Sequence, residues 1–294
     1  MRAEFLGKHV RGVPGVTFFI KELLQAMASM KPLIRNAHDV FLKTLLGVAV
    51  VAFPLLTVGC ASETPGAEAQ AQTEGASDTL NTLTKAQRES GWQLLFDGDS
   101  LSKWRGYKDR PVPEGWSAQN GQITLAPPES DTAGGDLVTK KQYDDFELRF
   151  DWKISKGGNS GVIYRLSEDQ KFTFMTGPEY QILDDAHHGN AADGPAYMTG
   201  ANYALHATDT TAVRPARQWN EARILVRGDH VEHWLNGQKV VEYELGSADW
   251  KRRVADSKFS DWPGYGQNDT GRIALQDHGQ KVWFRNLAIR SLGE

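Results

Sequence analysis

The chain has 294 residues, a formal net charge of −4 and one cysteine. This length suits one large domain or two small ones, and the acidic balance gives no reason to expect a nucleic-acid partner. A lone cysteine excludes an internal disulfide, so the stability of the fold has to come from its core. The 29 glycines and 9 tryptophans favour β-structure with tight turns, and tryptophan also serves as a platform for sugar rings.

Residues 1–59 are expected to lie outside the fold. The run "FLKTLLGVAVVAFPLLTVGC" is apolar but short, follows basic residues and is interrupted by Pro54, which is typical of a signal peptide rather than a membrane span. Its end resembles a bacterial lipobox, so we expect Cys60 to carry a lipid. The protein would then be exported and anchored to the bacterial cell envelope, in the periplasm or at the outer membrane. Because Met30 begins a segment with the proportions of a complete signal, we expect the true start there and regard residues 1–29 as a gene-model extension.

Residues 60–83 are predicted to form the lipidated cysteine and a solvated tether, because they are rich in Ala, Glu, Thr, Ser and Gln and lack aromatics. The folded domain is then 84–294. It begins with "TKAQ", which has capping-box spacing from Thr84, and Gly91 suits the end of a short helix. No linker is visible inside this range, which favours a single domain.

Alternation of apolar and polar residues predicts an all-β fold. In "FELRFDWKI", 146–154, every second residue is apolar, which is the period of a strand with one buried face. The dipeptide Asn236–Gly237 between two β-rich runs predicts a hairpin with a type I′ turn. Further strands are expected in 161–166, 179–183, 222–228, 271–279 and 282–290. Many strands without a long amphipathic helix predict an antiparallel β-sandwich of the jelly-roll type, whose concave sheet forms a groove.

Five segments in order resemble the 3-keto-disaccharide hydrolase family: "WQLLFDGDSLSKWRG", "GGDLVTKKQYDDFELRFDWKISKGGNSGVIYR", "GPEYQILDDAHH", "WNEARILVRGDHVEHWLNGQKVVEYE" and "IALQDHGQKVWFRNLAIR". The resemblance extends from about Gly91 to Arg290. It implies a concanavalin A-like lectin/glucanase sandwich that acts on glycosides already oxidised at C3. A separate sugar 3-dehydrogenase would supply that oxidised substrate.

The chemistry that this resemblance implies is lyase or hydratase chemistry with net hydrolysis. A ketone at C3 acidifies the C2 proton, the substituent at C1 can then depart, and water can add to the resulting glucal. Neither nicotinamide nor flavin is expected in this step, and the sequence contains no GxGxxG fingerprint. Sandwich glucanases carry Glu-x-Asp-x-Glu on one strand, whereas the corresponding positions here are Glu179, Gln181 and Leu183. This departure disfavours two-carboxylate glycoside hydrolysis.

The segment "GPEYQILDDAHHGN", 177–190, holds the main catalytic candidates. Strand parity places Glu179 and Gln181 on one face, together with Asp185 as a further candidate. Glu179 is the predicted C2 base, because a partly dry groove raises a carboxyl pKa toward the useful range. His187 is the predicted acid for the leaving group or, alternatively, a metal ligand.

A second group follows in "LQDHG", 275–279, where Gln276 and His278 share one face and Asp277 takes the other. We expect a catalytic role for His278. The predicted substrate-binding residues are Asn159, Arg165, Gln181, Gln276 and Asp277. The need for a divalent metal, Ca²⁺ or a transition metal, stays open, with the candidate ligands Asp184, Asp185, His187 and His188.

The alternative interpretation is a non-catalytic carbohydrate-binding lipoprotein that uses the same sheet. Binding modules need aromatic and amide side chains but no clustered acids and imidazoles, so the two polar groups favour an enzyme. In either case the partner is a sugar, and contact with a membrane is expected only through the lipid anchor.

Overall fold

The structure, a computed structural model, describes residues 79–126 and 134–293. The predicted signal peptide, Cys60 and most of the predicted tether lie outside the described residues. Within the described ranges, no helix is long and apolar enough to span a membrane.

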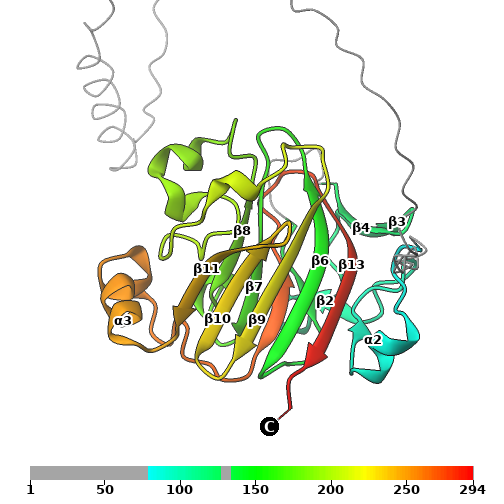
Figure 1. Cartoon of the computed structure of the whole chain (residues 1–294), viewed down its shortest axis with the longest axis horizontal. Helices are drawn as coiled ribbons and strands as arrows, with labels where there is room; N and C mark the ends of the chain where they lie inside the picture. Colours follow the sequence, from blue (N-terminus) through cyan, green and yellow to red (C-terminus); the bar gives the residue numbers. More distant parts are fainter. Residues whose placement is uncertain (1–78, 127–133, 294) are drawn as a thin grey trace, which may run out of the picture. The chain divides into compact units, whose positions relative to one another are not determined.

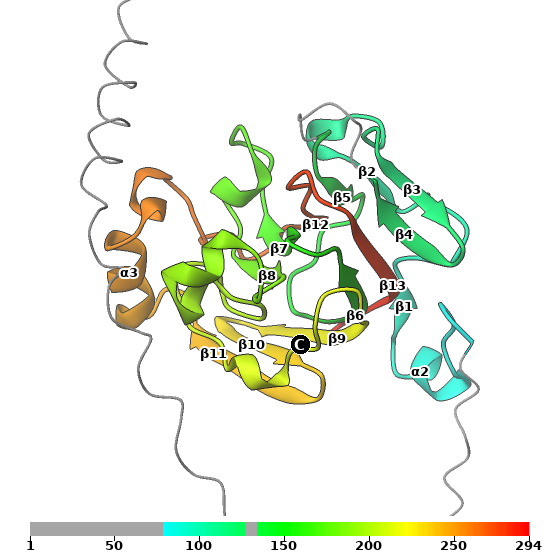
Figure 2. The ribbon, with the colours of Figure 1, turned by 90° about the horizontal axis from the view of Figure 1, so that it is seen from above.

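Two antiparallel sheets form the fold, and Figures 1 and 2 show them as two facing layers. Sheet A has the strand order β11 (Gln238–Glu244), β10 (His230–Leu235), β9 (Asn220–Arg227), β6 (Phe146–Ile154), β13 (Val282–Ser291), β4 (Gln122–Leu125) and β3 (Trp116–Gln119), with β1 (Gln93–Leu94) also on β13. Sheet B has the order β2 (Trp104–Gly106), β5 (Leu137–Thr139), β12 (Arg272–Leu275), β7 (Asn159–Leu166) and β8 (Glu179–Leu183). The predicted all-β antiparallel sandwich is therefore confirmed.

Helices are few and short in the described part of the chain. The α-helices α2 (Lys85–Glu89) and α3 (Ala248–Ala255) lie at opposite edges of the sandwich (Figure 1). The 3₁₀ segments are η1 (Tyr107–Asp109), η2 (Thr173–Met175), η3 (Gly189–Asp193), η4 (Pro195–Tyr197), η5 (Thr210–Ala212) and η6 (Lys258–Asp261).

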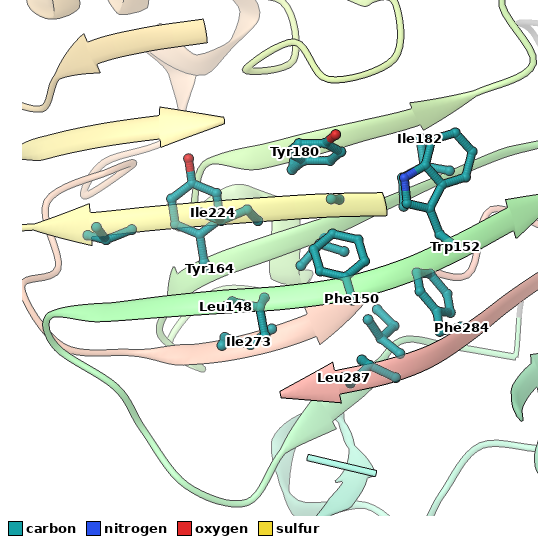
Figure 3. Close-up of a cluster of buried hydrophobic side chains, with 14 of the residues drawn as sticks. Leu148, Phe150, Trp152, Tyr164, Tyr180, Ile182, Ile224, Ile273, Phe284 and Leu287 are labelled. Carbon is teal, nitrogen blue, oxygen red and sulfur yellow. The ribbon is translucent and has the colours of Figure 1, made fainter. Parts of the chain in front are cut away.

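The core lies between the two sheets. The apolar residues of β6 are all buried, as the alternation predicts. Figure 3 shows Phe150 and Trp152 facing Tyr180 and Ile182 of β8, and the rings of Phe150 and Tyr180 meet edge-on with centroids 5.8 Å apart. Since side chains alternate along a strand, the residues beside Tyr180 and Ile182 project from the outer face of sheet B.

Two local predictions are confirmed. Thr84 Oγ1 accepts from the backbone N–H of Gln87 at 3.2 Å, and the side-chain Oε1 of Gln87 accepts from the backbone N–H of Thr84 at 2.8 Å. These two bonds complete the capping box of α2. Asn236 and Gly237 join β10 to β11 with φ values of 48° and 84°. A type I′ turn needs positive φ at both positions, which explains this dipeptide.

The outer face of sheet B is divided into an apolar end and a polar end. Val138, Ile163, Leu166 and Ala274 form a small buried cluster at one end. The strand residues farther along carry amide and carboxyl groups, and the cavity described below lies over them. Sheet B thus positions the site, while sheet A closes the core behind it.

The folded part begins before the predicted boundary at Thr84. Asn81 is buried, its Nδ2 donates to the Gly121 carbonyl at 2.9 Å, and its Oδ1 accepts from the Asn286 N–H at 2.8 Å. The predicted tether extended to residue 83 because composition does not reveal such long-range pairing. Its last residues instead dock on β13.

We expect Asn81→Gly to lower the free energy of unfolding by about 1–3 kcal/mol, because two partly buried backbone groups lose their partners. Glycine accepts the positive φ of 56° at this position, so the substitution tests the hydrogen bonds rather than backbone strain. Urea unfolding measures the change, with the neighbouring exposed Thr82→Ala as control. An unaltered midpoint and slope for Asn81→Gly would show that residues before 84 do not stabilise the fold.

Candidate active site

A cavity of about 150 Å³ opens on the outer face of sheet B. It is lined by Asn159, Phe174, Glu179, Gln181, Tyr203, Lys258, Phe259, Gln276 and His278. Typical ligand pockets measure about 300–1,000 Å³, so this space suits a single sugar ring better than a whole disaccharide. The cavity brings together five of the residues predicted from sequence, and it adds a lysine and three aromatic side chains from loops.

Glu179, at the start of β8, is the central ionisable group of the cavity. Its residue is only 6% exposed, and burial raises the pKa of its carboxyl to about 8. The positive charge of Lys258 opposes this rise, Asp136 adds to it, and a hydrogen bond from Gln276 lowers the pKa slightly. A carboxyl of this kind can take up a proton near neutral pH, which an ordinary surface glutamate does poorly.

Two neighbours determine where the Glu179 carboxyl lies. Gly161 of β7, which pairs with Gln181 and lies diagonal to Glu179, has no side chain, and a Cβ there would approach Glu179 Oε1 to 2.0 Å. The Gln181 amide nitrogen, turned toward the acceptors around it, donates to the Ser160 carbonyl at 3.0 Å and to Glu179 Oε1 at 3.2 Å. The carboxyl therefore lies flat over β7 rather than extending into solvent. This explains why position 161 is a glycine.

The parity predicted for β8 is confirmed for Glu179 and Gln181 but not for Asp185. Glu179 and Gln181 of β8 line the cavity, and so do Gln276 and His278 beyond β12. Asn159, the first residue of β7, is 3% exposed and also lines it, and its Oδ1 is buried without a hydrogen-bond partner. Two amides and this unpaired oxygen give the cavity several groups that can bind sugar hydroxyls.

Lys258 also lines the cavity, and no pattern in the sequence predicts that it does. It is the first residue of η6, far from the predicted motifs, and its Nζ lies 4.4 Å from the ring centroid of Tyr203. Burial lowers its pKa, and attraction to Glu179 raises it. Of the side chains that line the cavity, Lys258 is the only lysine or arginine. A lysine in a loop after a short helix carries no sequence signal that distinguishes it from a surface lysine.

The histidines divide between the cavity and its surroundings. His278 lines the cavity, and its ring centroid lies 6.4 Å from that of His188. Burial lowers the pKa of His188, and the nearby His278 lowers it further. His187 lies outside the lining residues, with about half of its side chain exposed and its Nδ1 2.9 Å from Asp184 Oδ2.

Asp184 and Asp185 brace the backbone rather than face the cavity. Asp184 Oδ2 accepts from the Gly157 N–H at 2.7 Å, which ties the β6–β7 turn to the end of β8. Asp185 Oδ1 accepts from the Thr199 N–H at 2.9 Å and from its hydroxyl at 3.1 Å. Burial raises the pKa of Asp185, whose Oδ2 is buried without a partner. The structure thus separates Asp185 from Glu179 and Gln181.

Asp277 also has a bracing position. Its Oδ2 accepts from the Gly134 and Gly135 N–H groups at 2.7 and 3.2 Å, and its Oδ1 accepts from the Gly279 N–H at 2.9 Å. Its own N–H donates to Asp136 Oδ1 at 2.8 Å, and burial raises the pKa of Asp136 to about 6. With its oxygens so engaged, Asp277 supports the loop beside the cavity instead of lining it.

The prediction that Arg165 faces the groove is corrected by the structure. The register of β7 on β12 shifts between Arg272 and Ala274, and Arg165 has a φ of 49° at this bulge. An extra residue in a strand turns the following side chains to the other face. Arg165 consequently pairs with Asp145 Oδ1 at 3.1 Å and lines a different cavity, of about 670 Å³, beside α3.

The four candidate metal ligands are not gathered at one point. Among the described residues, the only group of three or more potential ligand atoms within 4.8 Å of one another is His230, Glu232 and Glu242, on sheet A and away from the cavity. In the part of the chain that the structure describes, Asp184, Asp185, His187 and His188 therefore do not form a preassembled metal site.

A larger cavity of about 550 Å³ lies on the outer face of sheet A, between Trp92 and Trp234. Neither this cavity nor the one beside α3 contains Glu179, His278 or Lys258. Groups with a shifted pKa in a small cleft are the better indication of chemistry. The cavity on sheet B is therefore the candidate active site.

Several known proteins are similar to this chain. The profile of the family described as "3-keto-alpha-glucoside-1,2-lyase-like domain" matches residues 91–290. A 3-keto-disaccharide hydrolase from Bacteroides thetaiotaomicron is 32% identical over 259 residues, which cover 76% of this chain and 89% of that protein. Two crystal structures from Parabacteroides distasonis, provisionally assigned as glycosyl hydrolases, are also similar. One is 37% identical with a TM-score of 0.67 and covers 73% of this chain and 100% of that chain. The other is 30% identical with a TM-score of 0.52, and the match covers 68% of this chain and 99% of that chain.

We expect the Glu179 carboxyl to titrate at a pH of about 8, because burial disfavours its charged form. Carbon-13 NMR of glutamate-labelled protein measures this, and the resonance is assigned by its loss in Glu179→Gln. Glu168 is the internal reference, because hydrogen bonds from Arg105 contribute most to lowering its pKa to about 2. It should stay ionised down to the acid limit of the titration. A Glu179 midpoint at the ordinary value for glutamate would refute the buried, dry environment of this carboxyl.

Proposed function

The chain belongs to the 3-keto-alpha-glucoside-1,2-lyase-like family, which places it among carbohydrate-active proteins, and we propose that it is an enzyme that cleaves glycosides already oxidised to a ketone at C3. Glu179 removes the C2 proton, and the C1 substituent then departs. Water adds to the resulting glucal, so that the net reaction is hydrolysis.

The observation that carries this proposal is the buried carboxyl of Glu179 without a carboxylate partner. Among the lining residues it is the only aspartate or glutamate. Classical glycoside hydrolysis needs two carboxyl groups about 5–10 Å apart on either side of the scissile bond. One base of raised pKa is sufficient when a ketone has already acidified the adjacent C–H bond, because C1 then loses its substituent by elimination.

The departing oxygen at C1 needs a proton, and His278 is the candidate donor in the cavity. The sequence predicts His187 for this role, but the His187 ring contacts Asp184 and lies outside the cavity lining. His278 lies at the turn beyond β12, opposite the β8 strand that carries Glu179. Histidine is the side chain that most often transfers protons as a general acid or base in enzymes.

The size of the cavity supports a substrate whose oxidised ring is buried and whose other part projects outward. About 150 Å³ holds one ring, and Asn159, Gln181 and Gln276 offer amides to its hydroxyls. The proposal also requires a partner activity. A separate sugar 3-dehydrogenase has to introduce the ketone, because no step assigned to the cavity residues oxidises a sugar.

We expect the protein to convert a 3-keto-glucoside and to leave the unoxidised glucoside untouched. In D₂O, elimination and rehydration should place deuterium at C2 of the released 3-keto-glucose, which NMR and mass spectrometry detect. Glu179→Gln keeps the shape of the side chain and removes the base, so turnover should fall by about 10²–10⁴-fold while sugar binding persists. Turnover of the wild type should rise with pH up to about 8, as Glu179 loses its proton.

The matched control is Glu221→Gln, on the outer face of sheet A and away from the cavity. A reaction without enzyme corrects for background exchange at C2. Release of 3-keto-glucose that is still protiated at C2 would indicate direct displacement at C1 and would reject the elimination. Binding of such sugars without any conversion would instead favour the carbohydrate-binding alternative.

A further inference from the structure

We propose that Lys258 is a catalytic residue whose ammonium group binds the C3 oxygen of the substrate and stabilises the negative charge that forms there. This inference rests on the proposed function, because it concerns the step in which Glu179 removes the C2 proton. It assigns a chemical role to a residue that no sequence motif indicates.

The first argument is the position of Lys258 relative to Glu179. Both side chains line the same small cavity, on loop and strand respectively, and their charges attract each other. A base that removes the C2 proton and a cation that receives charge on the C3 oxygen act on adjacent atoms. A cavity of about 150 Å³ keeps both groups within reach of one sugar ring.

The second argument is that no carboxylate in the part of the chain that the structure describes neutralises the charge of Lys258 in a salt bridge. In the part of the chain that the structure describes, Lys258 forms no salt bridge, and Glu179 is the group whose attraction raises its pKa. When Glu179 becomes protonated by the substrate, that attraction ends. The ammonium can then interact with the new anion. The negative charge has moved from the Glu179 carboxylate to the C3 oxygen of the substrate, and Lys258 can attract it in both places.

The third argument is the way in which the ammonium is held. Its Nζ lies over the ring of Tyr203 at 4.4 Å, with the rings of Phe259 and Trp262 at 5.4 and 6.0 Å. Cation–π contacts favour the charged form of an amine. The Ser257 hydroxyl accepts from the Phe259 N–H at 3.2 Å and fixes the start of η6. Although Lys258 is exposed, its ammonium therefore already lies against aromatic rings at the cavity, where it can stabilise a developing charge.

The step balances without a further reactant. The Glu179 carboxylate accepts the C2 proton, the C2–H electron pair forms a C2–C3 double bond, and the C3 carbonyl π-pair moves to oxygen. That oxygen accepts a hydrogen bond from the Lys258 ammonium. In the second half the C3 carbonyl re-forms, a C1–C2 double bond forms, and the C1–O bond breaks as the departing oxygen takes a proton. Lys258 remains an ammonium throughout and forms no covalent bond.

The experiment separates proton removal from departure of the C1 group. The probe is the 3-keto derivative of 1,5-anhydroglucitol, which has the C2–H bond beside the ketone but no leaving group at C1. In D₂O the wild type should exchange the C2 proton. Lys258→Met should slow this exchange by about 10²–10³-fold, the loss typical of one group that stabilises an oxyanion. Lys258→Arg, which keeps the charge, should retain a substantial part of the rate, and Lys251→Met on α3 should retain all of it.

A second readout distinguishes chemistry from packing. Because Lys258 lowers the pKa of Glu179, Lys258→Met should move the rise of the exchange rate to higher pH, while Lys258→Arg should leave it in place. A slower rate with an unmoved pH profile would indicate that the lysine only packs on Tyr203 and would overturn the proposal. So would a Lys258→Met enzyme with the exchange rate of the wild type.

A third readout tests the covalent alternative, in which the amine condenses with the ketone. Borohydride added during turnover of a 3-keto-glucoside should leave the protein mass unchanged. A reduced sugar adduct on Lys258 would contradict the non-covalent role. If the wild type neither exchanges the probe nor cleaves a 3-keto-glucoside, the proposed function itself fails, and that result is distinct from any effect confined to the variants.

Discussion

The burial of one carboxyl group, that of Glu179, is the constraint around which the site is built. Desolvation disfavours its charged form and raises its pKa to about 8. The fold has to supply this environment without neutralising the group by a salt bridge. It does so by placing Glu179 on the outer face of a strand whose other face is fixed in the core by Tyr180 and Ile182. The rigidity of the sandwich thus holds the carboxyl in place.

The neighbours of this carboxyl follow from the same constraint. Gly161 leaves the space that the Glu179 side chain occupies. Gln181, the next residue on the same face of β8, donates a hydrogen bond to the Glu179 carboxyl. Lys258 brings a positive charge from a loop at the cavity mouth and keeps the pKa from rising further. In the proposed mechanism these groups have complementary roles, since the base becomes neutral as the C3 oxygen becomes negative. The surroundings of the carboxyl therefore need to exclude water and still contain polar groups such as the Gln181 amide and the Lys258 ammonium.

The sequence predicted the parts of this arrangement that depend on strand parity. Glu179 and Gln181 share a face because alternation along a strand is a property of the backbone. Gln276 and His278 lie just beyond β12 and reach the same cavity from the turn. Parity failed for Arg165, where an extra residue in β7 changes the face. Strands of two to four residues, such as β1 and β2, carry too little alternation to be found from sequence. Lys258 reaches the cavity through packing of a loop, which no local pattern encodes.

The clustering of acids and imidazoles in 177–190 had two causes that composition could not separate. Glu179 belongs to the cavity, whereas Asp184 and Asp185 bind backbone N–H groups of a neighbouring turn and loop. A short aspartate that follows a strand is well suited to such bracing. The cluster thus lines the candidate active site at one end and braces the backbone at the other.

The measurement that tests this account most directly is a crystal structure of Glu179→Gln with an uncleaved 3-keto-glucoside bound. The account predicts that the oxidised ring occupies the cavity on sheet B, with C2–H facing the residue 179 amide and the C3 oxygen facing the Lys258 ammonium. The C1 substituent should point out of the cavity past His278. A sugar bound instead on the outer face of sheet A between Trp92 and Trp234, with the sheet B cavity empty, would contradict it.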